Sequence, residues 1–170
     1  MTITYIGIGA NLNNPKKRVQ MAIADLEKLP DTNLLIHSSL YRSQPLGPQN
    51  QPDYINAVAA FETRLSPYEL LRKLQQLETQ QGRQRNYERW GSRVIDLDIL
   101  LYGDIQMQGD DLIIPHPQLA WREFVLYPLA EITRNLILPA GKSLLTLKAQ
   151  CSIRNMMSLS NENSCVSRNV

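Results

Sequence analysis

The stretch "GSRVIDLDILLYG", residues 91–103, has the alternation of a half-buried β-strand but carries two carboxylates on one side. Asp96 and Asp98 stand at spacing i, i+2 and therefore point the same way. The opposite, apolar face consists of Ile95, Leu97, Ile99 and Leu101. Aspartate is depleted in strands, and adjacent like charges repel. The pair therefore indicates that something positive lies beside or between the two carboxylates.

The chain before this stretch predicts three further strands and two helices. In chain order, the predicted elements are a strand over 3–10, a helix opened by the Asn14–Pro15 cap, strands over 33–42 and 54–62, a helix from the Ser66–Glu69 capping box to Gly82, and the strand within 91–103. Three prolines and a glycine make 42–53 a loop. The order βαββαβ is that of a ferredoxin-like α+β fold. We expect both helices on one face of an antiparallel sheet, with the other face partly open for a ligand.

Length and composition indicate a globular protein with one core. The chain has 170 residues, of which 43% are hydrophobic and 20% charged, and both fractions are ordinary for a soluble protein. We expect a single domain over 1–150 and a polar tail over 151–170 that is loosely ordered at its end. Cys151 and Cys165 both fall in this tail and match no metal-binding spacing. This use of cysteine is typical of a reducing compartment.

Charge and hydropathy argue against two classes of partner. A formal net charge of +2 is too small to indicate nucleic acid by itself. No run approaches the ~18 apolar residues that span a bilayer. The N-terminal residues "MTITYIGIGANLNN" lack the basic leader and cleavage site of a signal peptide. We therefore expect a cytoplasmic protein with neither a nucleic-acid nor a membrane partner.

Asp96 and Asp98 are candidate magnesium ligands. Same-side residues on a strand lie about 6.6 Å apart at Cα, twice the rise per residue. Two carboxylates at this separation can converge on one Mg²⁺ or bridge two ions about 3.5–4 Å apart. The alternative is a solvated outer face on which aspartate is merely tolerated.

A cluster of arginines directly precedes the aspartate strand. It consists of Arg83, Arg85, Arg89 and Arg93. A guanidinium presents a fork of donors suited to phosphate oxygens, although a solvated loop or an RNA-contacting patch could have the same composition. The neighbouring aspartates favour a magnesium–polyphosphate site. No G-x-x-x-x-G-K-[ST] motif occurs, and "GIGAN" at 7–11 lacks the third glycine of a dinucleotide fingerprint. Side chains and metals must therefore hold any nucleotide.

Three further side chains are candidates for ligand binding. Tyr54 and Asn56 lie on the face of their strand opposite the apolar one. An aromatic plane beside an amide that both donates and accepts suits a flat heterocycle. His116 follows a predicted strand end, where a structural role is the alternative to a catalytic one.

Four stretches together resemble the 6-hydroxymethyl-7,8-dihydropterin pyrophosphokinases of folate biosynthesis. They are "GANL" near the start, "YRSQPLGPQNQPDYINA", "LETQQGRQRNYERWGSRVIDLDILLYG" and "IPHPQLAWREFVLYPLAEI". The resemblance runs in order from about residue 3 to 140, and W-G-x-R-x-x-D-x-D is its most specific part. It implies a Mg-dependent enzyme that transfers the terminal diphosphate of ATP to the hydroxymethyl group of the pterin and releases AMP. It also implies two Mg²⁺ ions, small-molecule substrates and a monomer.

The resemblance further implies roles for individual residues. Asp96 and Asp98 would hold both metal ions and, with Arg83 and Arg93, form the catalytic set. The residues implied on the ATP side are Gln75, Glu78, Arg85, Trp90, Arg93, Ile99, His116 and Arg122. Those implied around the pterin are Ser43, Gln44, Leu46, Tyr54, Asn56, Trp90 and Phe124, with the rings of Tyr54 and Phe124 on either side of it. Trp90 would lie on a loop that closes over the site.

The sequence departs from the family pattern at a few positions. Members often have threonine and proline where Ser43 and Gln44 stand, and a basic residue in place of Asp111. Asn86 replaces a lysine of some relatives, and Pro117 an aromatic residue. These changes bear on secondary ATP contacts and not on the aspartate pair.

Two other interpretations of the sequence stay open. One is a nucleotidyl or glycosyl transferase that uses a D-x-D motif. The other is a ferredoxin-like RNA-binding module, which would need no paired aspartates.

Overall fold

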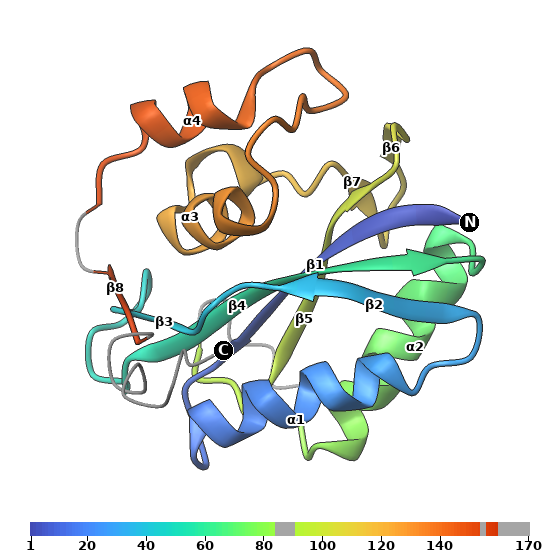
Figure 1. Cartoon of the computed structure of the whole chain (residues 1–170). Coiled ribbons are helices and arrows are strands. Elements are labelled where there is room, and N and C mark those ends of the chain that lie inside the picture. The colour runs from blue at the N-terminus through green and yellow to red at the C-terminus, as the bar shows by residue number, and fades with distance from the viewer. Residues whose placement is uncertain (84–90, 154–155, 160–170) are drawn as a thin grey trace, which may run out of the picture.

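The computed structural model describes residues 1–83, 91–153 and 156–159. The predicted βαββαβ order is present and is followed by further elements (Figure 1). In chain order, the structure contains β1 (Thr2–Ala10), α1 (Pro15–Glu27), β2 (Thr32–His37), β3 (Tyr41–Ser43), β4 (Tyr54–Thr63), α2 (Pro67–Gln80), β5 (Asp96–Tyr102), β6 (Met107–Gln108), β7 (Ile113–Ile114), a 3-10 helix (Leu119–Trp121), α3 (Glu123–Ile132), α4 (Leu144–Gln150) and β8 (Met156–Ser158).

The main sheet is antiparallel and has β1 and β4 at its centre. Its strand order is β5-β1-β4-β3-β8, and β2 pairs with the other end of β4. A separate hairpin consists of β6 and β7. Because β1 lies between β4 and β5, its side chains have neighbours on both sides. Residues far apart in sequence are thereby set in rows across the sheet.

Helices α1 and α2 cover one face of the sheet, as predicted (Figure 1). The predicted caps are present: the Asn14 side chain accepts from Lys17 N at 3.4 Å, and Ser66 and Glu69 form the capping box of α2. Gly82, with φ of +90°, follows the end of α2 in the left-handed conformation that glycine adopts readily. The apolar stripes of the two helices and the inward face of β1, β4 and β5 form the first core.

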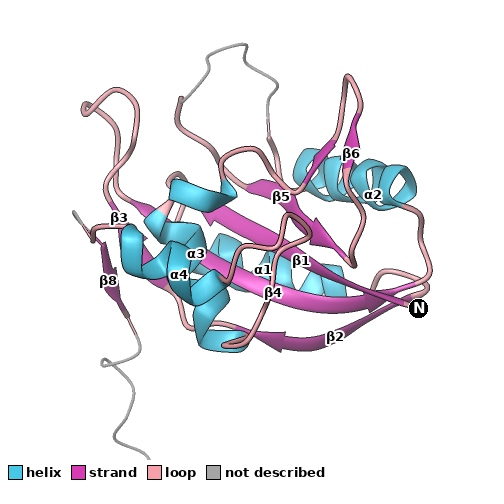
Figure 2. Cartoon of the chain, turned by 90° about the horizontal axis from the view of Figure 1, so that it is seen from above, coloured by secondary structure: helices cyan, strands magenta, loops and turns pink. Residues whose placement is uncertain are grey.

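Helices α3 and α4 lie on the other face of the sheet, toward β3 and β4 (Figure 2). A second core fills the space between these helices and the sheet. Val58, Leu100 and Leu126 belong to it, and each is at most 1% exposed. The second face is therefore partly open, as predicted, and the ligand platform is confined to the part of the sheet that α3 leaves uncovered.

Three local features differ from the sequence prediction. The strand expected over 33–42 is divided, because the Ser38 hydroxyl accepts from Val58 N at 3.0 Å and the regular ladder is interrupted there. The alternation of β5 fails at Leu100, where the register with β1 shifts, so Leu101 packs in the second core instead of the first. Part of the predicted tail, residues 156–158, forms β8 and pairs with β3.

Candidate active site

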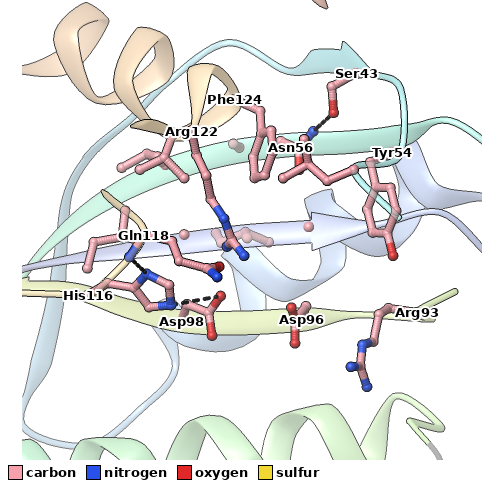
Figure 3. A pocket seen from close by; sticks show the side chains of 18 of the residues that line it. Ser43, Tyr54, Asn56, Arg93, Asp96, Asp98, His116, Gln118, Arg122 and Phe124 are labelled. Atoms are coloured by element: carbon pink, nitrogen blue, oxygen red, sulfur yellow. Dashed lines mark hydrogen bonds and ion pairs between the residues drawn. The ribbon is translucent and has the colours of Figure 1, made fainter. Parts of the chain in front are cut away.

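A cavity of about 340 Å³ opens on the uncovered part of the second sheet face. Strands β1, β4 and β5 form its floor, and the segment around Ser43 and the start of α3 form two of its walls (Figure 3). The residues with side chains of chemical interest that line it are Ser43, Gln44, Tyr54, Asn56, Arg83, Arg93, Asp96, Asp98, His116, Gln118, Arg122 and Phe124. Most of the sequence-predicted site residues thus meet in one cavity.

The strand register sets the order of groups across the cavity floor. Gly9 on β1 pairs with Asn56 of β4 on one side and with Asp96 of β5 on the other. In the next row, Gly7 lies between Val58 and Asp98. Neighbouring strands are about 4.8 Å apart, so an amide and a carboxylate face the cavity roughly 10 Å from each other across a glycine. A molecule lying over Gly9 can reach both.

The two aspartates lie side by side on β5 and point into the cavity, as the i, i+2 spacing predicts (Figure 3). Burial and the neighbouring charge of Asp98 together raise the pKa of Asp96 to about 6, against the lowering effect of the nearby arginines. Burial also raises the pKa of Asp98. Both shifts mean that the charged forms are costly here without a cation. The pair is therefore suited to binding one.

Arg83 supplies positive charge on one side of the aspartates. Its guanidinium lies 2.8 Å from Asp96 Oδ1 and also donates to the Glu78 carboxylate. Glu78 is only 6% exposed, and its Oε1 accepts from Leu97 N at 2.8 Å. Glu78 does not line the cavity; it links α2 to β5 and holds Arg83 beside the aspartates.

Two other residues assigned to the ATP side also lie away from the cavity. Gln75 is on the outer surface of α2, together with Arg72 and Thr79. Ile99 is 3% exposed and packs in the first core, on the opposite face of β5 from the aspartates. A side-chain contact from either residue to a ligand in the cavity is therefore not supported.

The main chain of Arg93 is held by a residue that the sequence analysis did not single out. The Asn11 side chain, 2% exposed, accepts from Arg93 N at 2.7 Å and donates to Pro52 O at 3.0 Å. The backbone N–H of Asn11 donates to Arg93 O at 2.9 Å. Asn11 thus joins the end of β1 to the loops on both sides of the cavity. The sequence carries a hint of this role, since Asn11 is a polar residue directly after a buried strand.

His116 faces the aspartates from the segment between β7 and α3. Its Nδ1 accepts from Gln118 N at 3.1 Å, which leaves the proton on Nε2. Burial and the positive charge of Arg122 lower the pKa of His116 to about 4. The ring is therefore neutral and presents an N–H toward the cavity. Gln118, which the sequence analysis did not assign, lines the cavity beside it.

Arg122 and Phe124 come from the start of α3 and form one wall (Figure 3). The guanidinium carbon of Arg122 lies 5.5 Å from the Phe124 ring centre and 5.9 Å from that of Trp121. Burial lowers the pKa of Arg122, while the charges of Asp98 and Asp96 act against this shift. Arg122 remains charged at neutral pH, because arginine starts from a pKa far above 7. It adds a second cation beside the carboxylates.

Tyr54, Asn56 and Phe124 enclose the other end of the cavity. In Figure 3 the two rings stand on either side of Asn56. The Asn56 amide is 5% exposed and donates from Nδ2 to the Ser43 hydroxyl at 2.8 Å. The Tyr54 hydroxyl donates to Gly91 O at 2.8 Å, which fixes its ring. A flat ligand can enter between the rings and meet the amide at its edge.

Other residues named in the sequence analysis lie at the rim of the cavity, outside the described residues, or away from the cavity. Gln44 and Leu46 line the outer rim of the cavity, and the Leu46 side chain is 55% exposed. Arg85, Trp90 and Asn86 lie outside the described residues, so their assignments stay predictions. Asp111 lies between β6 and β7 and does not line the cavity.

The cavity has few protein ligands for a metal ion. Within residues 1–83, 91–153 and 156–159, no group of three or more histidine, cysteine, aspartate or glutamate side chains is arranged to bind one. Among the described residues that line the cavity, Asp96 and Asp98 are the carboxylates. Mg²⁺ commonly takes one or two protein carboxylates and completes its octahedron with water and phosphate oxygens. The residues present therefore fit magnesium that arrives with a polyphosphate.

Solved structures share this fold. The HPPK-DHPS of Plasmodium falciparum in complex with SDX-DHP matches 88% of this chain with a TM-score of 0.65 at 13% identity. The same protein with pteroate matches 88% with a TM-score of 0.68 at 13% identity. The match spans 43% and 42% of those longer chains.

Among the residues described here, no helix combines the length and apolar character needed to cross a membrane.

Curated relatives are much more similar in sequence. The 2-amino-4-hydroxy-6-hydroxymethyldihydropteridine pyrophosphokinase of Haemophilus influenzae is 47% identical over 159 residues, 94% of this chain and 99% of that protein. The enzyme of the same name from Pseudomonas aeruginosa is 46% identical over 147 residues, 86% of this chain and 90% of that protein. Residues 5–134 match the family model of 7,8-dihydro-6-hydroxymethylpterin-pyrophosphokinase. The chain belongs to the 7,8-dihydro-6-hydroxymethylpterin-pyrophosphokinase family.

Proposed function

We propose that the cavity is the active site of a Mg-dependent pyrophosphokinase. The reaction moves the terminal diphosphate of ATP to the hydroxymethyl oxygen of 6-hydroxymethyl-7,8-dihydropterin and releases AMP, a step of tetrahydrofolate biosynthesis. The observation that carries the proposal is the row Asn56–Gly9–Asp96 across the sheet. It brings a slot for a flat heterocycle and a pair of carboxylates for a metal–phosphate complex to the two ends of one floor.

The pterin occupies the slot between Tyr54 and Phe124 in this proposal. Its faces stack on the two rings, and its amide-like edge pairs with Asn56, whose orientation is set by the Ser43 hydroxyl. Gly9 presents no side chain, so the heterocycle can lie against the backbone of β1. The hydroxymethyl group then points along the floor toward Asp96.

The nucleotide phosphates lie over β5 in this proposal. Asp96 and Asp98 would hold two Mg²⁺ ions, and the bound metal would supply neutralisation of phosphate charge. Arg83 and Arg93 contact the phosphates from one side and Arg122 from the other. His116 donates a hydrogen bond from Nε2–H to a phosphate oxygen and keeps its proton. At this nitrogen it cannot act as a base, because Nδ1 already accepts from Gln118 N.

The proposal extends to domain organisation, assembly and location. Residues 1–150 form the catalytic domain, and the segment 151–170 contributes an edge strand through β8. The monomer that the family resemblance implies is part of the proposal. A cytoplasmic location is supported by the use of ATP as co-substrate.

The test is to identify the nucleotide product. The protein is mixed with MgATP and the dihydropterin alcohol, and phosphorus NMR follows the phosphates. Stoichiometric AMP with pterin diphosphate is expected. ADP would indicate an ordinary kinase, and free pyrophosphate a nucleotidyl transferase; either would overturn the proposal.

A further inference from the structure

A carboxylate outside the cavity connects two of its walls. Glu131 lies in the last turn of α3, whose first turn carries Phe124. Its Oε1 accepts from both the backbone N–H of Ser39, at 3.0 Å, and the Ser39 hydroxyl, at 2.7 Å. Its Oε2 accepts from the Tyr41 hydroxyl at 2.7 Å. One exposed side chain therefore makes three hydrogen bonds to a segment about 90 residues earlier in the chain.

The position of Glu131 is unfavourable for the helix itself. A negative charge near the C-terminal end of a helix opposes the macrodipole, and α3 carries no basic residue in its last turn. Any stabilisation that the Glu131 carboxylate provides must therefore come from its contacts with residues outside α3. The carboxylate and the Tyr41 hydroxyl also affect each other: burial, together with the hydrogen bond to Glu131, raises the pKa of Tyr41, so the hydroxyl stays a donor.

The segment bound by Glu131 leads directly to the heterocycle slot. Ser39 lies at the break between β2 and β3, next to Ser38, whose backbone N–H donates to Val58 O at 2.8 Å. Tyr41 begins β3 and Ser43 ends it, and the Ser43 hydroxyl accepts from the Asn56 amide in the slot. The two ends of the Glu131 contact thus belong to the elements that carry Phe124 and Ser43.

We propose that Glu131 is a positioning residue for pterin binding, which holds the Phe124 wall at a fixed separation from the Ser43–Asn56 wall. This inference rests on the proposed function of the cavity. Ser43 pairs with Tyr54 in the β3–β4 register, so the Ser43–Asn56 wall also carries the ring that faces Phe124 across the slot. A slot that stacks on both faces of a flat ring is sensitive to its width, because dispersion contacts weaken within 1 Å of extra separation. The arginines on the phosphate side tolerate the same shift, since their long side chains can readjust.

The chain offers a closely matched control at Glu69. This exposed glutamate also accepts from the backbone N–H and the hydroxyl of one serine, Ser66, at 2.8 and 2.6 Å. It caps α2, on the face of the sheet that is remote from the cavity. Glu69→Ala therefore removes the same kind of contact without touching either wall. A loss of stability alone affects both variants in the same way.

The experiment measures pterin and ATP affinity separately, by fluorescence titration, for Glu131→Ala, Glu131→Gln and Glu69→Ala. We expect Glu131→Ala to bind pterin roughly tenfold more weakly, about 1.4 kcal/mol, while its ATP affinity changes less than twofold. Glu131→Gln can still accept from Ser39, so it should recover most of the loss. Glu69→Ala should bind both ligands as the unmodified protein does.

A double-mutant cycle tests whether Glu131 acts through Phe124. If it does, Glu131→Ala in a Phe124→Ala background should cost less than threefold in pterin affinity, because the wall to be positioned has been removed. Normal pterin binding by Glu131→Ala, equal losses for both ligands, or full additivity in the cycle would overturn the inference. Failure of the unmodified protein to bind pterin would instead overturn the proposed function.

Discussion

The imidazole Nε2 of His116 lies 3.9 Å from Asp98 Oδ2, and the ring is neutral. A histidine beside a carboxylate is more often protonated, since an opposite charge favours the charged form. Here burial and the nearby Arg122 outweigh that attraction and lower the pKa of His116 to about 4. The site therefore keeps a hydrogen-bond donor whose charge does not change between pH 5 and 8.

This neutral state predicts how acid affects stability. The pKa of His116 is lower in the folded protein than its usual 6.5, so between pH 6.5 and 4 the unfolded chain binds more protons. The contribution of His116 to the free energy of unfolding must therefore fall as the pH falls through this window. His116→Asn keeps an acceptor for Gln118 N and never ionises. Between pH 7 and 4 we expect it to lose less stability than the unmodified protein, by on the order of 2 kcal/mol.

Urea denaturation without magnesium, at several pH values, measures this difference. Equal acid sensitivity of the two proteins would show that folding does not lower the pKa of His116. A Ser152→Ala variant, changed outside the cavity, provides the reference for ordinary variation.

Asp96→Asn and Asp98→Asn distinguish a metal-binding role of the two carboxylates from a solvent-exposed position without function. Each substitution keeps the shape and removes one charge. If the carboxylates bind magnesium, each variant should lose roughly a hundredfold or more in turnover with MgATP and pterin. Solvated side chains would instead leave turnover unchanged and the free energy of unfolding within about 0.5 kcal/mol.

Thermal unfolding of the same variants without metal completes this test. The pKa of Asp96 is raised to about 6, so its charged form destabilises the folded state at pH 7. Its side chain is 34% exposed, and solvent screening limits the gain from Asp96→Asn to about 1 kcal/mol at most. An inactive variant that is at least as stable as the unmodified protein supports the metal site. Near-normal turnover in both variants contradicts it.

Asn56 and Tyr54 should contribute unequally to pterin binding. Asn56→Ala removes a buried amide and leaves the Ser43 hydroxyl without this donor, which should cost about 1–3 kcal/mol of pterin affinity. Tyr54→Phe keeps the stacking ring and loses only the bond to Gly91 O, so a smaller effect is expected. Calorimetric titration of both variants with pterin compares them. Normal binding by Asn56→Ala would mean that this strand face does not read the heterocycle.

Gly9→Ala tests the cavity floor. A Cβ at this position would lie 3.2 Å from Asn56 Oδ1, so the amide has to move by a few tenths of an ångström. We expect roughly fivefold weaker pterin binding, on the order of 1 kcal/mol, with unchanged ATP affinity. Stability should hold or rise slightly, since alanine is less costly than glycine within a strand. Unaltered pterin affinity would show that the ligand does not approach β1.

The main elements and the facing of the aspartates were predictable because they depend on local patterns. The alternation of β1, the Asn14 and Ser66 caps and the Asp96–Asp98 spacing each involve residues within a few positions of one another. Local periodicity determines which face a strand residue occupies. These predictions were confirmed.

The features that the sequence did not predict depend on distant partners. Ser38 interrupts a strand by binding Val58, and β8 forms only because β3 offers an unpaired edge. Glu78 had been expected at the nucleotide, yet it is buried where it can accept from Leu97 N and Arg83. No spacing within the sequence encodes such contacts, which require the strands to be placed in register.

The floor of the cavity is more rigid than its walls. Gly7 and Gly9 lie on β1, which is hydrogen-bonded to a strand on each side, so the floor cannot move to admit a thicker molecule. The surrounding walls come from loops and from the start of a helix, which yield more easily. A competitive inhibitor should therefore be planar over Gly9 and carry its variable substituents toward Leu46 or Gln118. Discrimination between related enzymes would then be sought in the walls, while affinity comes from the rigid base.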